Sequence, residues 1–451
     1  MYRQQLDYLS QWVKVKHRKP IIIRGARQVG KSTLVRLLSQ QCFLDLIELN
    51  FERNPELATL FKSHDPQKIL QLISLQTGKT LQPGRTLLFL DEIQEATEAI
   101  VALRYFYEEL PELHILAAGS LLEFTLSKAA FSIPVGRIEY LHIGPMTLIE
   151  FMLALGESAL SEFLQNYQIH QEIPKPIHDK LMDITKIYFI IGGMPESIQA
   201  YLEDNTFQTS EKVKQSILST YRDDFGKYAL TTLHELTRKI FTKIPLMIGD
   251  KFKYSQISRE SKSIQVATAL NQLCLARVAW KVHHTSANGV PLGAEQNDRF
   301  FKVLFLDVGL VSTSLGLSYL NLVDVDELIF INKGNMAEQF IGQHLLYLNP
   351  SYEEPHLYYW VREKKSAAAE IDYMISFGQQ IIPIEVKAGK TGQMKSLHIF
   401  LKEKQRYLGV RFNSEPPSLI DTTINLSDGS EVAFRLLSLP FYLVERLNQL
   451  I

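Results

Sequence analysis

Eight residues near the amino terminus combine the residue types that bind a chain of phosphates. The stretch from Gly25 to Ser32 reads GARQVGKS and matches the phosphate-binding pattern GxxxxGK(S/T) at every defined position. The two glycines allow backbone conformations in which successive amide N–H groups point inward around phosphate oxygens. Lys31 would then contact the β- and γ-phosphates, and the Ser32 hydroxyl would be a ligand of Mg²⁺. The predicted nucleotide-binding residues are Gly25, Ala26, Arg27, Gln28, Val29, Gly30, Lys31, Ser32 and Thr33.

Two adjacent carboxylates follow a second apolar segment. The segment TLLFLDEIQ places Asp91 and Glu92 at the end of a buried-strand pattern. Open α/β sheets bind their ligands at the carboxyl ends of their strands. Asp91 would therefore hold Mg²⁺ through water, and Glu92 would polarise the attacking water as a general base. Acids at a strand end are often only solvated, but the phosphate loop before them favours the catalytic interpretation.

Two further residues could complete this site. Ser120 ends the apolar segment LHILAAGS, where its hydroxyl could sense the γ-phosphate beside Asp91; the alternative is a helix cap or turn residue. Arg137 follows a glycine in IPVGRIEY and could stabilise transition-state charge, within the subunit or across a subunit interface. It could equally be a structural arginine that is paired with a carboxylate.

The last third of the chain carries a second candidate site. Asp372 and the pair Glu385 and Lys387 form the spacing D-x₁₂-E-x-K, and strand alternation places Glu385 and Lys387 on one face. Two neighbouring carboxylates could hold a divalent metal, and the lysine could orient or help to deprotonate water for phosphodiester cleavage. The pattern is loose, because E-x-K occurs on many solvated strands and no proline precedes Asp372.

These residues need a defined set of elements to position them. A strand at Ile21 to Arg24 and an amphipathic helix at Ser32 to Gln41 flank the phosphate loop, and residues 146–235 have helical apolar spacing. Residues 236–290 have the pattern of a helix-turn-helix, which serves either DNA binding or protein packing. Its candidate base contacts are Ser263, Gln265 and Lys262, with Lys251, Lys253 and Arg259 near phosphates. From about residue 330 the pattern changes to alternating helices and strands.

The composition is that of a globular protein without a strong electrostatic preference. Apolar residues are 46% and charged residues 22% of the 451 residues, and the length predicts about two to four domains. The net charge of −1 implies no global attraction to nucleic acid or to a membrane. Cys42 and Cys274 form no disulfide or zinc pattern, and no apolar run approaches the roughly 18 residues of a spanning helix. We therefore expect a cytoplasmic protein.

Taken in order, the motifs resemble one known family. They are GARQVGKS, LFLDEIQ, AAGS, GRIEYLHIGPMTLIEF, IGGMPE, FLDVGL, EIDYMI and IPIEVKAGK, which extend over nearly the whole chain. The sequence resembles the archaeal and bacterial AAA-like ATPases that pair an amino-terminal P-loop domain with a carboxy-terminal domain of unknown function. The first two motifs are specific to P-loop NTPases, and the others are specific only as an ordered set.

The resemblance implies a fold and a function. It implies an α/β chain with four parts: a P-loop AAA-like ATPase core with a parallel sheet (1–145), a helical extension or lid (146–235), a winged-helix-like domain (236–300) and a restriction-endonuclease-like PD-(D/E)xK domain (301–451), with Glu338 as a helical acid of the last. It also implies ATP and Mg²⁺ as ligands, with a second divalent metal possible in the tail. Duplex DNA or a protein partner, and an oligomer, are further expectations. Three functions stay open: a DNA-coupled ATPase, a slowly hydrolysing nucleotide switch that presents the tail to a partner, and an ATP-regulated metal-dependent nuclease.

Overall fold

The computed structural model divides into two compact units. It describes residues 1–127, 132–225, 231–258, 260–317, 333–362, 369–387, 394–426 and 429–451. The amino-terminal unit contains Met1–Gly144, Leu275–Arg277 and Pro350–Glu354. The carboxy-terminal unit contains Pro145–Cys274, Val278–Asn349 and Pro355–Ile451. Within the described residues, no helix combines the length and the apolar character that crossing a membrane requires.

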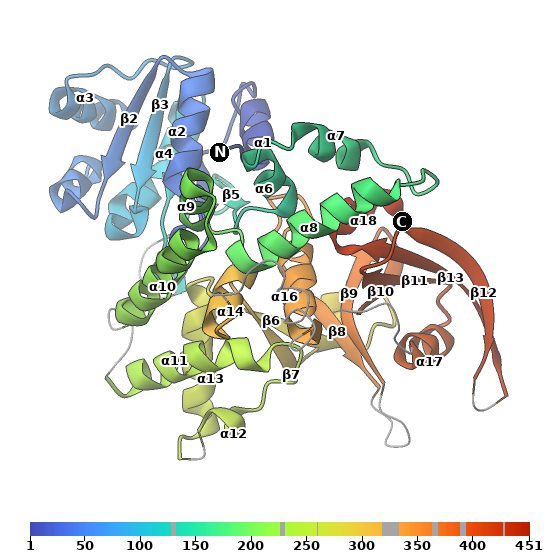
Figure 1. Cartoon of the computed structure of the whole chain (residues 1–451). Helices are drawn as coiled ribbons and strands as arrows, with labels where there is room; N and C mark the ends of the chain where they lie inside the picture. The colour runs from blue at the N-terminus through green and yellow to red at the C-terminus, as the bar shows by residue number, and fades with distance from the viewer. Residues whose placement is uncertain are drawn as a thin grey trace. The chain divides into compact units, whose positions relative to one another are not determined.

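The amino-terminal unit is built on a parallel sheet with helices on both faces (Figure 1). Its strand order is β2-β3-β4-β1-β5, and every neighbouring pair is parallel. The apolar runs in β3 and β4 are buried along their whole length, as a parallel sheet covered on both faces requires. The strands are β1 (Ile21–Arg24), β2 (Asp45–Asn50), β3 (Thr86–Asp91), β4 (His114–Ala118) and β5 (Glu139–His142), and the α-helices are α1 (Gln5–Trp12), α2 (Lys31–Cys42), α3 (Pro66–Thr77), α4 (Thr97–Glu109) and α5 (Leu122–Ser127).

The carboxy-terminal unit begins with helices. The helices predicted from GPMTLIEF and IHDKLMDITKIYFII are present as α6 and α8, and a complete capping box at Thr147 starts α6. The helices of this part are α6 (Leu148–Ala154), α7 (Ser158–Asn166), α8 (Lys175–Ile191), α9 (Pro195–Asp204) and α10 (Phe207–Asp224). Three more helices and an antiparallel hairpin follow: α11 (Thr231–Lys243), α12 (Tyr254–Ile257), α13 (Ser263–Leu275), β6 (Ala279–Thr285) and β7 (Gln296–Phe305).

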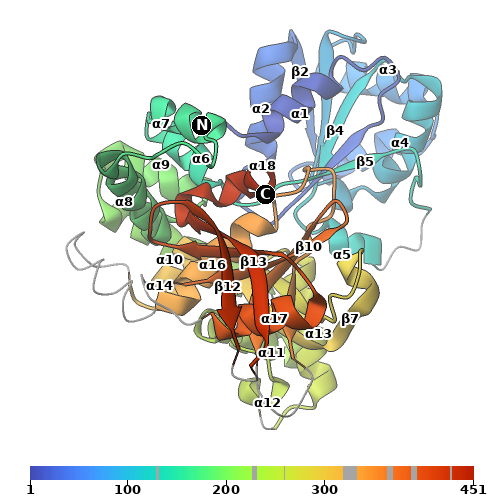
Figure 2. The same cartoon turned by 90° about the vertical axis from the view of Figure 1, so that its right-hand side faces the viewer.

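An eight-stranded mixed sheet organises the rest of this unit (Figure 2). Its order is β12-β13-β11-β10-β9-β8-β6-β7, so the hairpin β6–β7 shares one sheet with the last strands of the chain. Strand β9 is antiparallel to both of its neighbours, β8 and β10, whereas β10 and β11 are parallel. The elements are α14 (Val308–Ser314), α16 (Lys333–Leu345), β8 (Tyr358–Val361), β9 (Glu370–Phe377), β10 (Gln380–Val386), α17 (Lys395–Lys404), β11 (Leu408–Asn413), β12 (Ser418–Asn425), β13 (Glu431–Pro440) and α18 (Leu447–Leu450).

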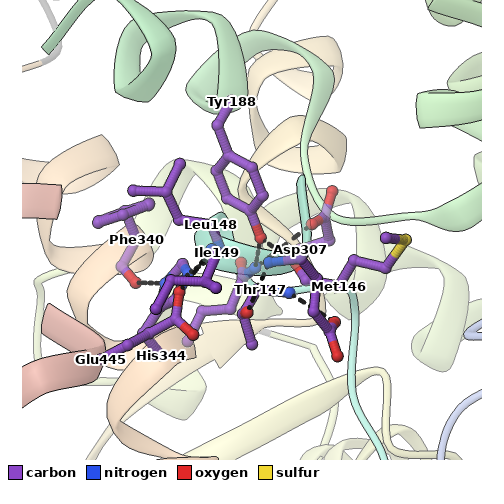
Figure 3. A network of polar contacts seen from close by, with 11 residues as sticks. Met146, Thr147, Leu148, Ile149, Tyr188, Asp307, Phe340, His344 and Glu445 are labelled. Atoms are coloured by element: carbon purple, nitrogen blue, oxygen red, sulfur yellow. Dashed lines mark hydrogen bonds and ion pairs between the residues drawn. The ribbon is translucent and has the colours of Figure 1, made fainter. Parts of the chain in front are cut away.

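Three of the sequence motifs meet in one buried network of this unit (Figure 3). The backbone N–H of Met146 donates to the carbonyl oxygen of Gly193 at 2.7 Å, and the Tyr188 hydroxyl donates to the carbonyl oxygen of Met146 at 2.5 Å. The N–H of Gly193 donates to the Asp307 carboxylate at 2.7 Å. A Cβ atom at Gly192 would overlap this carboxylate, so glycine is required there. The motifs GPMTLIEF, IGGMPE and FLDVGL thus have a packing role.

His344 anchors the start of α6 in the same network (Figure 3). Its Nδ1–H donates to the carbonyl oxygen of Phe340 at 2.8 Å, and its Nε2 accepts from the backbone N–H of Leu148 at 3.1 Å. Burial lowers the pKa of His344 to about 4, which keeps the ring neutral. A neutral ring is needed because only an unprotonated Nε2 can accept this bond.

Candidate active site

The phosphate loop has the backbone that its glycines predict. It joins β1 to α2, and Gly30 lies in the left-handed region with φ 93° at the amino end of the helix. Gln28 also has a positive φ of 62°. A Cβ atom at Gly25 would overlap the carbonyl oxygen of Ile143, so only glycine lets these two backbones approach.

Lys31 is held inside this loop by backbone carbonyls. Its side chain is buried, and its ammonium donates to the carbonyl oxygens of Gly25 at 3.0 Å and Ala26 at 2.7 Å. Burial lowers its pKa to about 8, against the opposing effect of Glu92 and Asp91. Phosphate oxygens could replace the two carbonyls and would favour the charged form further.

Asp91 lies at the carboxyl end of β3 among groups that suit a hard cation. The Ser32 hydroxyl donates to its carboxylate at 3.2 Å, and the Asn50 amide donates to it at 3.1 Å. Burial, and then the neighbouring Glu92, raise the pKa of Asp91. A hydroxyl and a carboxylate are oxygen ligands that Mg²⁺ takes, so Ser32 and Asp91 fit the ion that the motif implies. Asn50 was not predicted; the polar end of the strand DLIELN was its only signal.

Glu92 is oriented by three hydrogen bonds. Its backbone has φ 50°, and its carboxylate accepts from the Gln94 amide at 2.8 Å and from both the N–H and the hydroxyl of Ser120 at 3.1 Å. Burial alone would raise its pKa, but these bonds outweigh burial and lower it, so Glu92 is a carboxylate at neutral pH. A Cβ atom at Gly119 would overlap the Gln94 amide oxygen. The structure therefore brings Ser120 to Glu92, and adds Gln94 as a partner that the prediction missed.

Arg137 lies elsewhere in this unit. It precedes β5 at the amino-terminal edge of the sheet, whereas Lys31 and Asp91 lie at the carboxyl edge. Its guanidinium pairs with Glu108, in the last turn of α4, at 2.8 Å. Within one subunit the structure thus agrees with the structural interpretation of Arg137, and it does not place this side chain beside the phosphate loop. Arg27 lies beside Ser120 instead, since its Nε donates to the Ser120 hydroxyl at 3.2 Å.

Arg3 links the phosphate loop to the end of this unit. Its guanidinium is buried and donates to the carbonyl oxygens of Val29 at 2.7 Å and Gly144 at 2.8 Å. Sequence patterns could not indicate this contact, because its partners lie 26 and 141 residues further along the chain.

The predicted acids of the carboxy-terminal unit come together around a lysine. Lys302, from β7, is buried, and its ammonium lies 2.6 Å from Glu370, 3.5 Å from Glu338 and 3.8 Å from Asp372. The backbone N–H of Val386 donates to Asp372 at 2.8 Å, which joins β10 to β9 at this point. We call Lys302, Glu338, Glu370, Asp372, Glu385 and Lys387 the acid cluster.

Burial and the nearby like charges favour the protonated, neutral forms of the carboxyl groups in the acid cluster. Burial, and then the Asp372 charge, raise the pKa of Glu338 to about 8 and that of Glu385 to about 7. Lys387 pairs directly with Glu385. Among the described residues, no three His, Cys, Asp or Glu side chains are arranged to hold a metal ion. In this conformation the Lys302 ammonium supplies the positive charge, and neither Lys302 nor Glu370 was predicted.

The residues predicted to contact DNA in the helix-turn-helix lie in different places in the structure. Lys262 precedes α13, and Ser263 and Gln265 lie in its first turn, all exposed. Lys251 instead pairs with Glu370 at 3.4 Å and thus belongs beside the acid cluster. Lys253 is exposed, and Arg259 lies outside the described residues.

Family models match three successive parts of the chain. Residues 17–152 match a family described as an AAA domain. Residues 182–321 and 333–426 match two families, each described as a domain of unknown function (DUF8612 and DUF4143). A comparison with curated proteins finds no match.

A comparison with solved structures finds matches at low similarity. The Walker-type ATPase PABY2304 of Pyrococcus abyssi is 14% identical with a TM-score of 0.45, covering 69% of this chain and 95% of that chain. The ORC2 protein of Aeropyrum pernix, in ADPNP and ADP complexes, is 12% identical with a TM-score of 0.36, covering 74% and 95%. AMPPCP-bound DnaA of Aquifex aeolicus is 14% identical with a TM-score of 0.26, covering 59% and 84%. The AAA-domain match and the parallel sheet together support an AAA-like P-loop fold for the amino-terminal part of this chain.

Proposed function

We propose that the amino-terminal unit binds ATP with Mg²⁺ and hydrolyses it. The observation that carries this proposal is the convergence of Lys31, Ser32, Asp91 and Glu92 at the carboxyl edge of one parallel sheet. Each of these side chains has the chemistry that one step of hydrolysis needs, and each is held by contacts within the unit.

The residues divide the work between binding and proton transfer. The amide N–H groups of the loop and Lys31 would bind the phosphates, and Ser32 and Asp91 would hold Mg²⁺. When bound, Mg²⁺ would neutralise charge on the phosphate oxygens. Glu92, kept ionised by Gln94 and Ser120, would accept the proton of the attacking water. Ser120 would then report whether a γ-phosphate is present, because it bonds both Glu92 and Arg27.

Steady-state hydrolysis of ATP with Mg²⁺ tests this proposal. Glu92→Gln should lower kcat by about 100-fold or more while ATP still binds, since a general base contributes on the order of 10²–10⁴. Lys31→Ala should abolish hydrolysis and weaken ATP binding. Arg137→Ala is the matched control, because its partner Glu108 lies at the other edge of the sheet. A wild-type rate of ATP hydrolysis in Lys31→Ala would refute the proposed ATP-binding site. A loss of hydrolysis in Arg137→Ala would indicate that Arg137 acts across a subunit interface.

We further propose that nucleotide state controls how the carboxy-terminal unit engages DNA or a protein. The order of three helices and a hairpin over residues 231–305 supports a winged-helix-like module, with Lys262, Ser263 and Gln265 exposed at the start of α13. Hydrolysis measured with and without duplex DNA tests the coupling, as does the salt dependence of DNA affinity. Hydrolysis that ignores DNA would favour a protein partner, and a very slow basal rate that a partner accelerates would favour a nucleotide switch.

A second candidate function is metal-dependent cleavage of nucleic acid by the acid cluster. The order α16, three antiparallel strands, α17 and a strand parallel to β10 supports a restriction-endonuclease-like fold. Glu338, Asp372, Glu385 and Lys387 would be its PD-(D/E)xK residues, and a divalent metal would have to compete with the Lys302 ammonium. Nicking of plasmid DNA with Mg²⁺ or Mn²⁺ that disappears in Glu385→Ala would support cleavage. Inactivity on several DNA forms would leave the cluster a structural feature.

A further inference from the structure

A cavity of about 300 Å³ lies on the carboxy-terminal sheet next to the acid cluster. Strands β6, β7 and β8 supply most of its walls, and the residues that line it are Lys251, His284, Phe300, Tyr359 and Val361. Two lysines connect it to the acids. Lys251 lines the cavity and pairs with Glu370 at 3.4 Å, and the Lys302 ammonium lies 5.5 Å from the centre of the Tyr359 ring and 2.6 Å from Glu370.

Tyr359, one of the residues that line the cavity, has a hydroxyl that lacks a hydrogen-bond partner in the described part of the chain. Tyr359 is fully buried. Burial raises its pKa to about 12, so the hydroxyl stays a neutral donor. Leaving such a group unpaired is destabilising, and an acceptor on a ligand would satisfy it.

The other walls favour a flat aromatic ring. Phe300 is 55% exposed although it lies on a sheet strand, and the rings of Tyr359 and His284 meet edge to face at 5.8 Å. Exposed aromatic rings are the surfaces on which unpaired bases stack, and stacking tolerates every base. Lys251 adds a cation at the rim, where a phosphate beside a bound base could lie.

We infer that this cavity binds one unstacked nucleobase together with its adjacent phosphate. The base would stack on Phe300 and accept a hydrogen bond from the Tyr359 hydroxyl, and Lys251 would contact the phosphate. The inference rests on the proposed nuclease function for the source of the base, and it names the substrate: a single strand, or a strand with an extruded base, beside the cleaved phosphodiester. A paired base does not fit, because its ring is covered on both faces by its neighbours.

The test measures binding rather than cleavage. Fluorescence anisotropy with the full chain in EDTA would compare a labelled 12-nucleotide single strand of dT with the same strand carrying central abasic sites. We expect the intact strand to bind about ten-fold more tightly than the abasic strand, and Phe300→Ala to remove this difference. Tyr359→Phe should weaken the binding of the intact strand about five-fold and leave the affinity for the abasic strand unchanged. Phe377→Ala is the matched control, because Phe377 is an exposed phenylalanine of the same sheet outside the cavity.

Each outcome decides one part of the inference. Equal affinity for intact and abasic strands, or wild-type binding by Phe300→Ala and Tyr359→Phe, would overturn it. Binding of dTMP that depends on Tyr359, without any abasic effect on strands, would overturn the single-strand substrate and leave a mononucleotide site. Plasmid cleavage assayed in parallel separates the two proposals: base-dependent binding without cleavage would refute only the nuclease, and cleavage without base dependence would refute only the cavity's role.

Discussion

Replacing Lys302 with methionine tests how the acid cluster is held together. The ammonium is buried and contacts three carboxyl groups, of which the Glu370 carboxyl is the nearest at 2.6 Å. Removing one member of a buried charge network leaves the others uncompensated and costs about 3–5 kcal/mol. For a unit of this size, a loss of that magnitude lowers the melting midpoint by on the order of 10 °C. The carboxylates raise the pKa of Lys302, so its stabilisation is complete below the ordinary lysine pKa and is lost only above it.

Thermal melting at pH 7, followed by circular dichroism with and without Mn²⁺, measures this effect. Lys302→Met should melt well below wild type, and Mn²⁺ should raise its midpoint more than it raises the wild-type midpoint, because the vacated position leaves the carboxylates to a cation. Lys251→Met is the matched control, because it removes a lysine that is 40% exposed and pairs with the same Glu370. An exposed ion pair of this kind contributes only about 0–1 kcal/mol to stability. A midpoint of Lys302→Met equal to that of Lys251→Met would refute the electrostatic account of the cluster.

Three further results are expected. The pKa of Lys31 is about 8 and phosphates favour its charged form, so ATP binding at pH 8 should take up about half a proton. Calorimetry in two buffers of different ionisation enthalpy measures this proton uptake, and Lys31→Arg should remove it. The fold raises the pKa of Glu338 from its ordinary value of 4.5 to about 8, so the folded chain holds this proton more tightly than the unfolded chain does. The melting midpoint should therefore fall as the pH rises from about 4.5 to about 8, and Glu338→Gln should flatten that profile. Gly192→Ala should lower the free energy of unfolding of the carboxy-terminal unit by about 2 kcal/mol or more, because the new Cβ atom would overlap Asp307. Gly156 has a similar positive φ but lies in open space, so Gly156→Ala should cost only about 1 kcal/mol. Urea unfolding of both variants measures the difference.

The arrangement around the phosphate loop was largely predictable because its sequence pattern is local. GARQVGKS contains its own turn residues, cation and hydroxyl within eight positions, and an apolar run that ends in DE marks a strand and its carboxyl edge. The structure adds the partners that set how these groups behave. Asn50 reaches Asp91 only because β2 and β3 pair in register, and Ser120 reaches Glu92 only because β4 lies beside β3.

The sequence by itself determined the residue types of both sites, the alternation of strands and helices, and the loop that can bind phosphate. Tertiary structure alone decided which charges meet. Arg137 pairs with Glu108, 29 residues away, and Lys302 neutralises acids that lie 36, 68 and 70 residues further along the chain. Periodicity reports which face of an element is apolar, but it does not report which distant side chain will face a buried carboxylate. The pKa values of the acid cluster follow from those distant contacts and from burial, so they belong to the fold rather than to any motif.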